Sequence, residues 1–305
     1  MPIVFMGTPE FAVASLEALL NAGEDVAAVI TAPDKPAGRG QKLQESAVKK
    51  FAQAHQLPVL QPTNLKDPAF LSELKAFQAD LQVVVAFRML PEVVWNMPPK
   101  GTINLHASLL PQYRGAAPIN HAIINGETET GVSTFLLQHE IDTGNILFSE
   151  KVAIGPDDTA SDLHDKLMTV GAGLLVDTVK AVQKGEIAGQ PQPTDRDDLK
   201  PAPKIHKEDC LIDWNQPVRK VYNFIRGLSP YPTAYTSLEG KVLKIYGASP
   251  EESPVEQNPG TVESDGKSYL KFACNDGYIR VTDLQIQNKK RMNVTDFLRG
   301  YRLGQ

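Results

Sequence analysis

The first 150 residues alternate short apolar segments with stretches of helical periodicity. This alternation is typical of a parallel β-sheet whose strands are joined by crossover helices. The apolar segments predict strands over residues 3–6, 26–31, 58–60, 81–86, 101–106, 131–137 and 146–152. The 3.6-residue pattern predicts helices over residues 10–22, 46–55, 69–77 and 159–184. We therefore expect an α/β fold with a Rossmann-like, parallel-rich sheet and flanking helices.

The second part of the chain has a different composition. Prolines and glycines fall among charged residues over 185–206, which predicts an extended linker. One helix is predicted over 218–227, followed by short β-like segments at 233–237, 242–248, 260–263, 270–273 and 278–284. Their close spacing favours a small β-barrel of the OB type. The expected domains are residues 1–184, a linker over 185–206, and residues 207–305.

Charge and cysteine content narrow the class of protein. The formal net charge is −5, with −7 in residues 1–204 and +2 in residues 205–305, which argues against a general nucleic-acid binder. No apolar run approaches the ~20 residues that cross a bilayer, and residues 1–7 read as a first strand rather than a signal peptide. Cys210 and Cys274 have no metal-ligand or disulfide spacing. We expect a cytoplasmic protein that binds no membrane and no metal.

The opening segment Phe5-Met6-Gly7-Thr8-Pro9-Glu10 invites comparison with a dinucleotide-binding turn. It carries one glycine where the fingerprint needs three, and Pro9 and Glu10 occupy the turn that would face the phosphates. We therefore expect no bound NAD.

A polar pair lies where the predicted strand over 101–106 ends. Asn104 and His106 are two residues apart, so their side chains share one face of a strand. Pro111 cannot continue a central strand, which places the pair beside a loop. A histidine at such a place is more often structural than catalytic, and Asn or Asp in a loop is more often a turn former.

The complete sequence motif favours a catalytic role over these structural interpretations. The sequence Asn104-Leu-His106-Ala-Ser108-Leu-Leu-Pro111-Gln-Tyr-Arg114-Gly115, with Asp142-Thr143-Gly144 downstream, resembles the signature of the folate-dependent formyltransferases. The resemblance implies a Rossmann-like sheet without a nucleotide cofactor, 10-formyltetrahydrofolate as the formyl donor, and catalytic roles for Asn104, His106 and Asp142. It also assigns Ser108, Leu109, Leu110 and Pro111 to a folate-binding loop.

The chemistry of formyl transfer suits these residue types. Attack of an amine on the formyl carbon creates an oxyanion, which the Asn104 amide and a protonated or polarising His106 would stabilise. Asp142 would orient or charge His106, or accept the amine proton through water. Ser108 lacks the glycine elbow of a nucleophilic serine. The resemblance places the pterin beside Phe87, Arg88 and Met89, where this chain departs from the family's usual tyrosine–glycine pattern.

A basic, glycine-rich loop over residues 33–42 points to the substrate. On composition alone it is a solvated surface loop. It resembles the inserted loop of the branch that formylates initiator methionyl-tRNA, which implies phosphate contacts for Lys35, Arg39 and Lys42. Residues 202–214 resemble the linker of the same branch, which adds Lys204 and Lys207 as tRNA contacts, although plain surface charge explains both equally well.

The expected activity is formyl transfer from folate to the amino group of initiator methionyl-tRNA by a monomer. Two enzymatic alternatives share the Asn104, His106 and Asp142 set: a formyltransferase acting on a nucleotide-linked sugar or other small amine, and a formyl-folate hydrolase. The basic loop and the barrel-like C-terminal part argue against both. A non-catalytic tRNA-binding protein is the third alternative, and the intact catalytic set argues against it.

Overall fold

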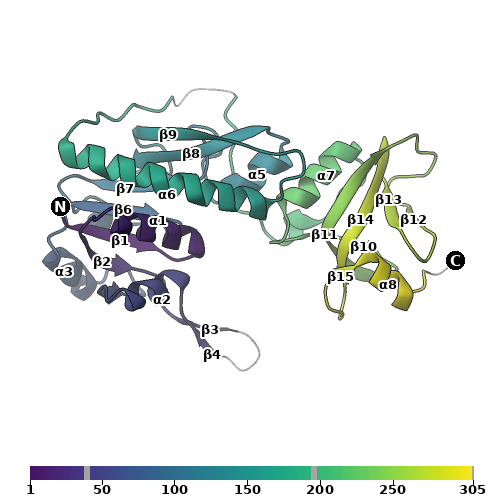
Figure 1. Cartoon of the computed structure of the whole chain (residues 1–305), viewed down its shortest axis with the longest axis horizontal. Helices are drawn as coiled ribbons and strands as arrows, with labels where there is room; N and C mark the ends of the chain where they lie inside the picture. The colour runs from purple at the N-terminus through teal and green to yellow at the C-terminus, as the bar shows by residue number, and fades with distance from the viewer. Residues whose placement is uncertain (38–41, 194–197, 304–305) are drawn as a thin grey trace. The chain divides into compact units, whose positions relative to one another are not determined.

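The computed structural model describes every residue except 38–41, 194–197 and 304–305 (Figure 1). The chain divides into two compact units. The N-terminal unit comprises residues 1–115, 130–152 and 164–201. The C-terminal unit comprises residues 116–129, 153–163 and 202–305. Two short segments that precede residue 164 thus belong to the C-terminal unit.

A seven-stranded sheet forms the centre of the N-terminal unit, with the order β5-β2-β1-β6-β7-β8-β9. The strands are β1 (Ile3–Gly7), β2 (Val26–Ile30), β5 (Val59–Leu60), β6 (Leu81–Val85), β7 (Thr102–His106), β8 (Glu129–Leu136) and β9 (Ile146–Ala153). The pairs from β5 to β7 are parallel, and β8 is antiparallel to β7. Every residue of β1 and β6 is buried, as expected for central strands of a covered sheet. The predicted strands and the Rossmann-like fold are confirmed.

Helices accompany the strands of this sheet, and three of them begin at a side-chain cap. They are α1 (Glu10–Asn21), α2 (Ala47–Ala54), α3 (Pro68–Ala76), α4 (Glu92–Trp95) and the long α6 (Ala160–Lys184). The Ser46 and Asp67 side chains accept hydrogen bonds from the first turns of α2 and α3. Thr159 and Asp162 cap α6 reciprocally, with each side chain accepting from the other residue's backbone N–H. The start of the helix predicted over 159–184 is thus confirmed to within one residue.

The two faces of β7 are distinguished by what covers them. A Cβ added to Gly171 of α6 would lie 3.0 Å from the Leu105 side chain, so α6 covers the Leu105 face. Asn104 is in register with Val84, and Val84 packs with residues of α3 and α4. Because register neighbours point to the same side of a sheet, Asn104 and His106 lie on the face opposite α6.

The C-terminal unit holds a curled antiparallel sheet in the order β10-β11-β14-β13-β12, with β15 paired to β14. The strands are β10 (Ala234–Leu238), β11 (Lys241–Glu252), β12 (Val262–Ser264), β13 (Leu270–Ala273), β14 (Gly277–Ile286) and β15 (Met292–Asn293). The register between β11 and β14 shifts around Gly247, an irregularity that bends a strand. The result is an open half-barrel, consistent with the barrel-like architecture expected from the sequence.

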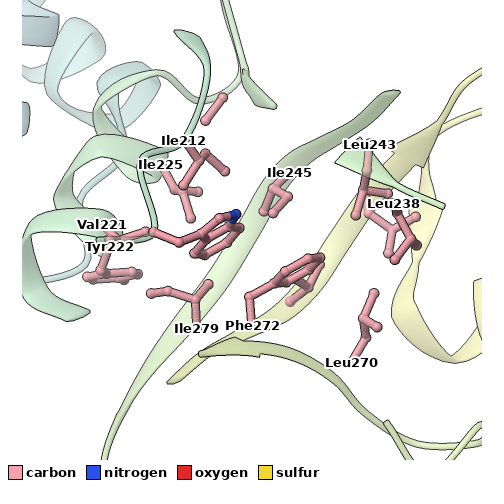
Figure 2. Packing of buried hydrophobic residues seen from close by; sticks show 14 of the residues in the cluster. Ile212, Val221, Tyr222, Ile225, Leu238, Leu243, Ile245, Leu270, Phe272 and Ile279 are labelled. Atoms are coloured by element: carbon pink, nitrogen blue, oxygen red, sulfur yellow. The ribbon is translucent and has the colours of Figure 1, made fainter. Parts of the chain in front are cut away.

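One apolar cluster holds the C-terminal unit together (Figure 2). Helix α7 (Val218–Gly227) contributes its buried face, including Val221 and Ile225. The Trp214 indole stacks on Phe272 with ring centroids 4.6 Å apart, and its N–H donates to the Thr236 hydroxyl. The remaining helices of this unit are α5 (Pro118–Ile124), the short 3₁₀ helix η1 (Glu208–Cys210) and α8 (Val294–Gly300).

The sequence prediction was wrong in several local respects. The expected loop over 33–42 contains an antiparallel hairpin, β3 (Lys35–Ala37) with β4 (Lys42–Gln44). Strand β11 is longer than predicted because its second half continues to pair with β14. The short elements α4, α5, α8 and β15 were not predicted. Among the described residues, no helix is long and apolar enough to cross a membrane.

Candidate active site

His106 lies at the carboxyl end of β7 and is almost fully buried. Its Nε2 lies 2.9 Å from the Tyr113 carbonyl oxygen. A carbonyl oxygen only accepts, so this contact assigns a proton to Nε2. The other ring nitrogen, Nδ1, faces Asp142, and 3.8 Å separates it from Oδ2. That separation exceeds a hydrogen bond, so Nδ1 is the ring nitrogen left available for chemistry.

Asp142 lies on the loop between β8 and β9 and is as buried as His106. Its Oδ2 accepts a hydrogen bond from the Gly115 backbone N–H at 3.0 Å. The φ angle of Asp142 is 55°, in the left-handed region, and Tyr113 has a φ of 59°. Such conformations cost ~1–3 kcal/mol and persist where surrounding contacts hold them, often at functional sites. The loop after β7, which contains Tyr113, and the loop that contains Asp142 therefore both hold a residue in a strained backbone conformation.

Gly144 lets this loop approach the sheet. A Cβ at this position would overlap the Leu136 carbonyl oxygen and lie 2.8 Å from the carbonyl carbon. The backbone of Leu136 also donates its N–H to Asn145. The loop that positions Asp142 thus passes over the end of β8 at a distance that only glycine permits.

Asn104 completes the set on the same face of β7. It is partly exposed, whereas its neighbours Ile103 and Leu105 are buried in the sheet. Among the described residues, its side-chain amide has no hydrogen-bond partner. An amide that is fixed on a strand and still free to donate is suited to bind a developing oxyanion.

The segment after β7 is held by hydroxyl groups. The buried Ser108 hydroxyl donates to the Gln112 carbonyl at 2.6 Å. The Ser133 hydroxyl donates to the Ser108 carbonyl and accepts from the Leu110 N–H. The Ser108 hydroxyl therefore shapes the loop and is not presented as a nucleophile. Leu110 is buried, while Leu109 and Pro111 remain partly exposed.

The segment after β6 begins at the carboxyl edge of the sheet, as the segment after β7 does. Arg88 donates to the Thr63 carbonyl at 3.0 Å and to the Pro62 carbonyl. Burial lowers the pKa of the Arg88 guanidinium. Phe87 is partly buried, and Met89 is 73% exposed, an unusual state for a large apolar side chain. The Arg88 contacts hold the segment so that Met89 is presented to solvent.

The basic residues expected to contact tRNA fall in different parts of the chain. Lys35 is exposed in β3, Lys42 begins β4, and Arg39 lies outside the described residues. Lys204 and Lys207 are exposed in the C-terminal unit. The base of the hairpin is fixed by the Asp34–Lys49 ion pair, which also holds the pKa of the Asp34 carboxyl below its usual value.

Sequence reasoning missed Gln192. This residue lies in the segment expected to be a linker, yet its side chain is buried and bonded to the Asp142 loop. Two residues earlier, Gln190 forms an antiparallel bridge with Ile146 at the start of β9. The proline- and glycine-rich composition gave no signal for these contacts. Within the described part of the chain, no group of His, Cys, Asp and Glu could hold a metal ion.

The family follows from comparison with known proteins. Residues 1–179 match the formyl transferase family, and residues 204–302 match the formyl transferase C-terminal domain. The chain belongs to the formyl transferase family. The proteins named methionyl-tRNA formyltransferase from Parabacteroides distasonis and Bacteroides fragilis are 57% and 53% identical to it. Those matches cover 98% and 99% of this chain and 95% of each relative.

Solved structures with the same fold are more distant. A sugar 3N-formyl transferase, WlaRD, determined with dTDP and 5-N-formyl-THF, superposes with a TM-score of 0.67 at 20% identity, over 95% of this chain and 99% of that one. HypX from Aquifex aeolicus, determined with tetrahydrofolic acid, gives a TM-score of 0.67 at 18% identity, over 97% of this chain and 46% of that one. At such identities the likeness concerns the fold.

Proposed function

We propose that this chain transfers the formyl group of 10-formyltetrahydrofolate to the free amino group of initiator methionyl-tRNA. The observation that carries the proposal is the near-full-length identity of 57% and 53% to proteins named methionyl-tRNA formyltransferase, joined to an intact Asn104, His106 and Asp142 set. The folate-bound members of the fold support a folate donor.

In the proposed mechanism, the methionyl amine attacks the formyl carbon and forms a tetrahedral oxyanion. The Asn104 amide and Nδ1 of a protonated His106 donate to that oxygen. Because Nε2 of His106 is committed to the Tyr113 carbonyl, Nδ1 is the nitrogen that serves this role. The Asp142 carboxylate stabilises the imidazolium and receives the amine proton through water. Collapse of the intermediate breaks the bond to N10 of the folate, N10 takes up the proton that Asp142 received from the amine, and tetrahydrofolate leaves.

Binding roles follow from the sequence resemblance and remain proposals. Folate contacts fall to Ser108, Leu109, Leu110, Pro111, Phe87, Arg88 and Met89, and tRNA contacts to Lys35, Arg39, Lys42, Lys204 and Lys207. We further propose a catalytic domain over 1–184, a linker over 185–206 and a tRNA-binding domain over 207–305. We also propose that the protein is cytoplasmic and monomeric.

The test is formyl transfer to charged initiator tRNA by wild type and by Asn104→Ala, His106→Ala and Asp142→Ala. Each variant should lose at least ~10²-fold in kcat, the scale for losing an oxyanion donor or an acid–base group. Thermal melting and tRNA affinity should stay near those of wild type. A folded His106→Ala protein with near-normal turnover would refute the assignment. Wild-type activity on a sugar amine but not on methionyl-tRNA would replace the proposed substrate.

A further inference from the structure

We propose that Gln192 and Arg114 act as positioning residues that hold the Asp142 carboxylate against His106. This inference rests on the proposed function, because it concerns the efficiency of that reaction. Gln192 lies fifty residues from Asp142 in the sequence, and its side chain is 7% exposed. Neither side chain is assigned any part in the chemistry described above.

The Gln192 amide makes hydrogen bonds in two directions. Its Nε2 donates to the Asp142 carbonyl at 2.9 Å and to the Gly144 carbonyl at 2.7 Å. Its Oε1 accepts from Nε of Arg114 at 3.1 Å and from the terminal nitrogen Nη2 of the same guanidinium at 2.7 Å. Both amide hydrogens and the amide oxygen are therefore used. Because carbonyls only accept and a guanidinium only donates, the amide has one orientation that satisfies all four bonds.

These bonds close a ring around Asp142. The Arg114 side chain reaches the Asp142 backbone through Gln192, and the next residue, Gly115, donates its N–H directly to the Asp142 carboxylate. The preceding residue, Tyr113, accepts from His106. Residues 113–115 thus fix His106 on one side, and the Asp142 side chain and backbone on the other.

This ring of hydrogen bonds explains how Asp142 keeps an uncommon backbone conformation and a fixed carboxylate. Asp142 has a φ of 55°, which its own backbone does not favour. The two bonds from Gln192 fall on the carbonyls of Asp142 and Gly144, so they hold the backbone directly after the Asp142 side chain in place. Loss of those bonds frees the loop to relax and to change the 3.8 Å separation between Nδ1 of His106 and Oδ2 of Asp142.

Two substitutions of Gln192 separate positioning from simple packing. Gln192→Leu keeps the volume and removes all four bonds. Gln192→Glu keeps the acceptor for Arg114 but places a carboxylate oxygen against two carbonyl oxygens. Both should lower kcat by ~10–100-fold, since a misplacement of about 1 Å can cost ~10²-fold, while KM for folate and for tRNA changes less than ~3-fold. Arg114→Met should give a smaller loss of the same kind, partly rescued by Arg114→Lys.

A matched control is Gln82→Leu. Gln82 is buried in β6 and accepts from Thr102 at the amino end of β7, the end opposite His106. This variant should change stability and leave kcat near wild type. A loss of kcat equal to that of Gln192→Leu would indicate a general packing effect and overturn the proposal.

The double variant Gln192→Leu with Asp142→Ala tests whether Gln192 acts through Asp142. If it does, adding the Gln192 substitution to Asp142→Ala should cost less than ~2-fold more in kcat, because the group being positioned is already absent. Multiplication of the two single losses would mean that Gln192 acts elsewhere.

Hydrogen–deuterium exchange of the free protein provides a readout that needs no substrate. Backbone amides of residues 138–147 should exchange faster in Gln192→Leu than in wild type, while those of β1 and β6 stay protected. Unchanged exchange would refute the proposal that Gln192 holds this loop. If wild type fails to formylate methionyl-tRNA, the proposed function fails, and the exchange result still decides whether Gln192 holds the loop.

Discussion

Gly144→Ala should disable the site without unfolding the protein. A Cβ at this position would overlap the Leu136 carbonyl oxygen and lie 2.8 Å from its carbon, whereas nine in ten real Cβ contacts lie beyond 3.4 Å. Both atoms belong to the backbone, so the loop has to move by on the order of 1 Å. Asp142 is two residues away and moves with it. A misplacement of that size costs ~10²-fold in rate, or ~2.7 kcal/mol of transition-state stabilisation.

The assay is steady-state formyl transfer to methionyl-tRNA, with thermal unfolding measured on the same samples. The control is Gly173→Ala in α6, where an added Cβ meets nothing within 4 Å. That variant should keep full activity and gain about 0.5–1 kcal/mol of stability, because alanine is the better helix former. A folded Gly144→Ala enzyme with kcat within ~3-fold of wild type would refute the reasoning from loop geometry.

Two further predictions concern alkaline stability and tRNA binding. Burial raises the pKa of the Cys274 thiol from 9.0 to about 12, so its proton is bound more tightly in the folded state. The free energy of unfolding should therefore fall as pH rises from 9.0 towards 12. Measured by urea unfolding, this fall should be shallower in Cys274→Ala than in wild type. An equally steep fall in both proteins would contradict this account. Lys35→Ala should reduce the salt slope of tRNA binding by about one unit, and Lys180→Ala on α6 should not; equal slopes for both would exclude a phosphate contact at Lys35.

Elements governed by local pattern were predictable from the sequence. Strands β1 and β6 are short, mainly apolar runs buried on both faces, and such runs are recognised from the local sequence alone. Helix α6 begins directly after Thr159, whose side chain and an acidic residue three positions later cap each other. In each case the signal and the structure it specifies lie within a few residues.

Elements that depend on distant contacts were not predictable in the same way. The β3–β4 hairpin has proline and lysine where strands usually carry β-branched residues. Its base is held by contacts across the loop, the Asp34–Lys49 ion pair and the hydrogen bond between the Thr31 and Ser46 hydroxyls. These pairs are fifteen residues apart, and no local periodicity connects them.

The site shows the same limit in a sharper form. The motif predicts His106 and Asp142 as site residues, but much of what holds them in the structure is backbone. His106 donates to the carbonyl of Tyr113, Asp142 accepts from the N–H of Gly115, and Gln192 donates to the Asp142 and Gly144 carbonyls. Every residue has such backbone groups, so their use leaves no mark on the sequence. Only the geometry of the folded chain separates Gln192, whose amide satisfies four bonds at once, from the other polar residues of a segment that reads as a linker.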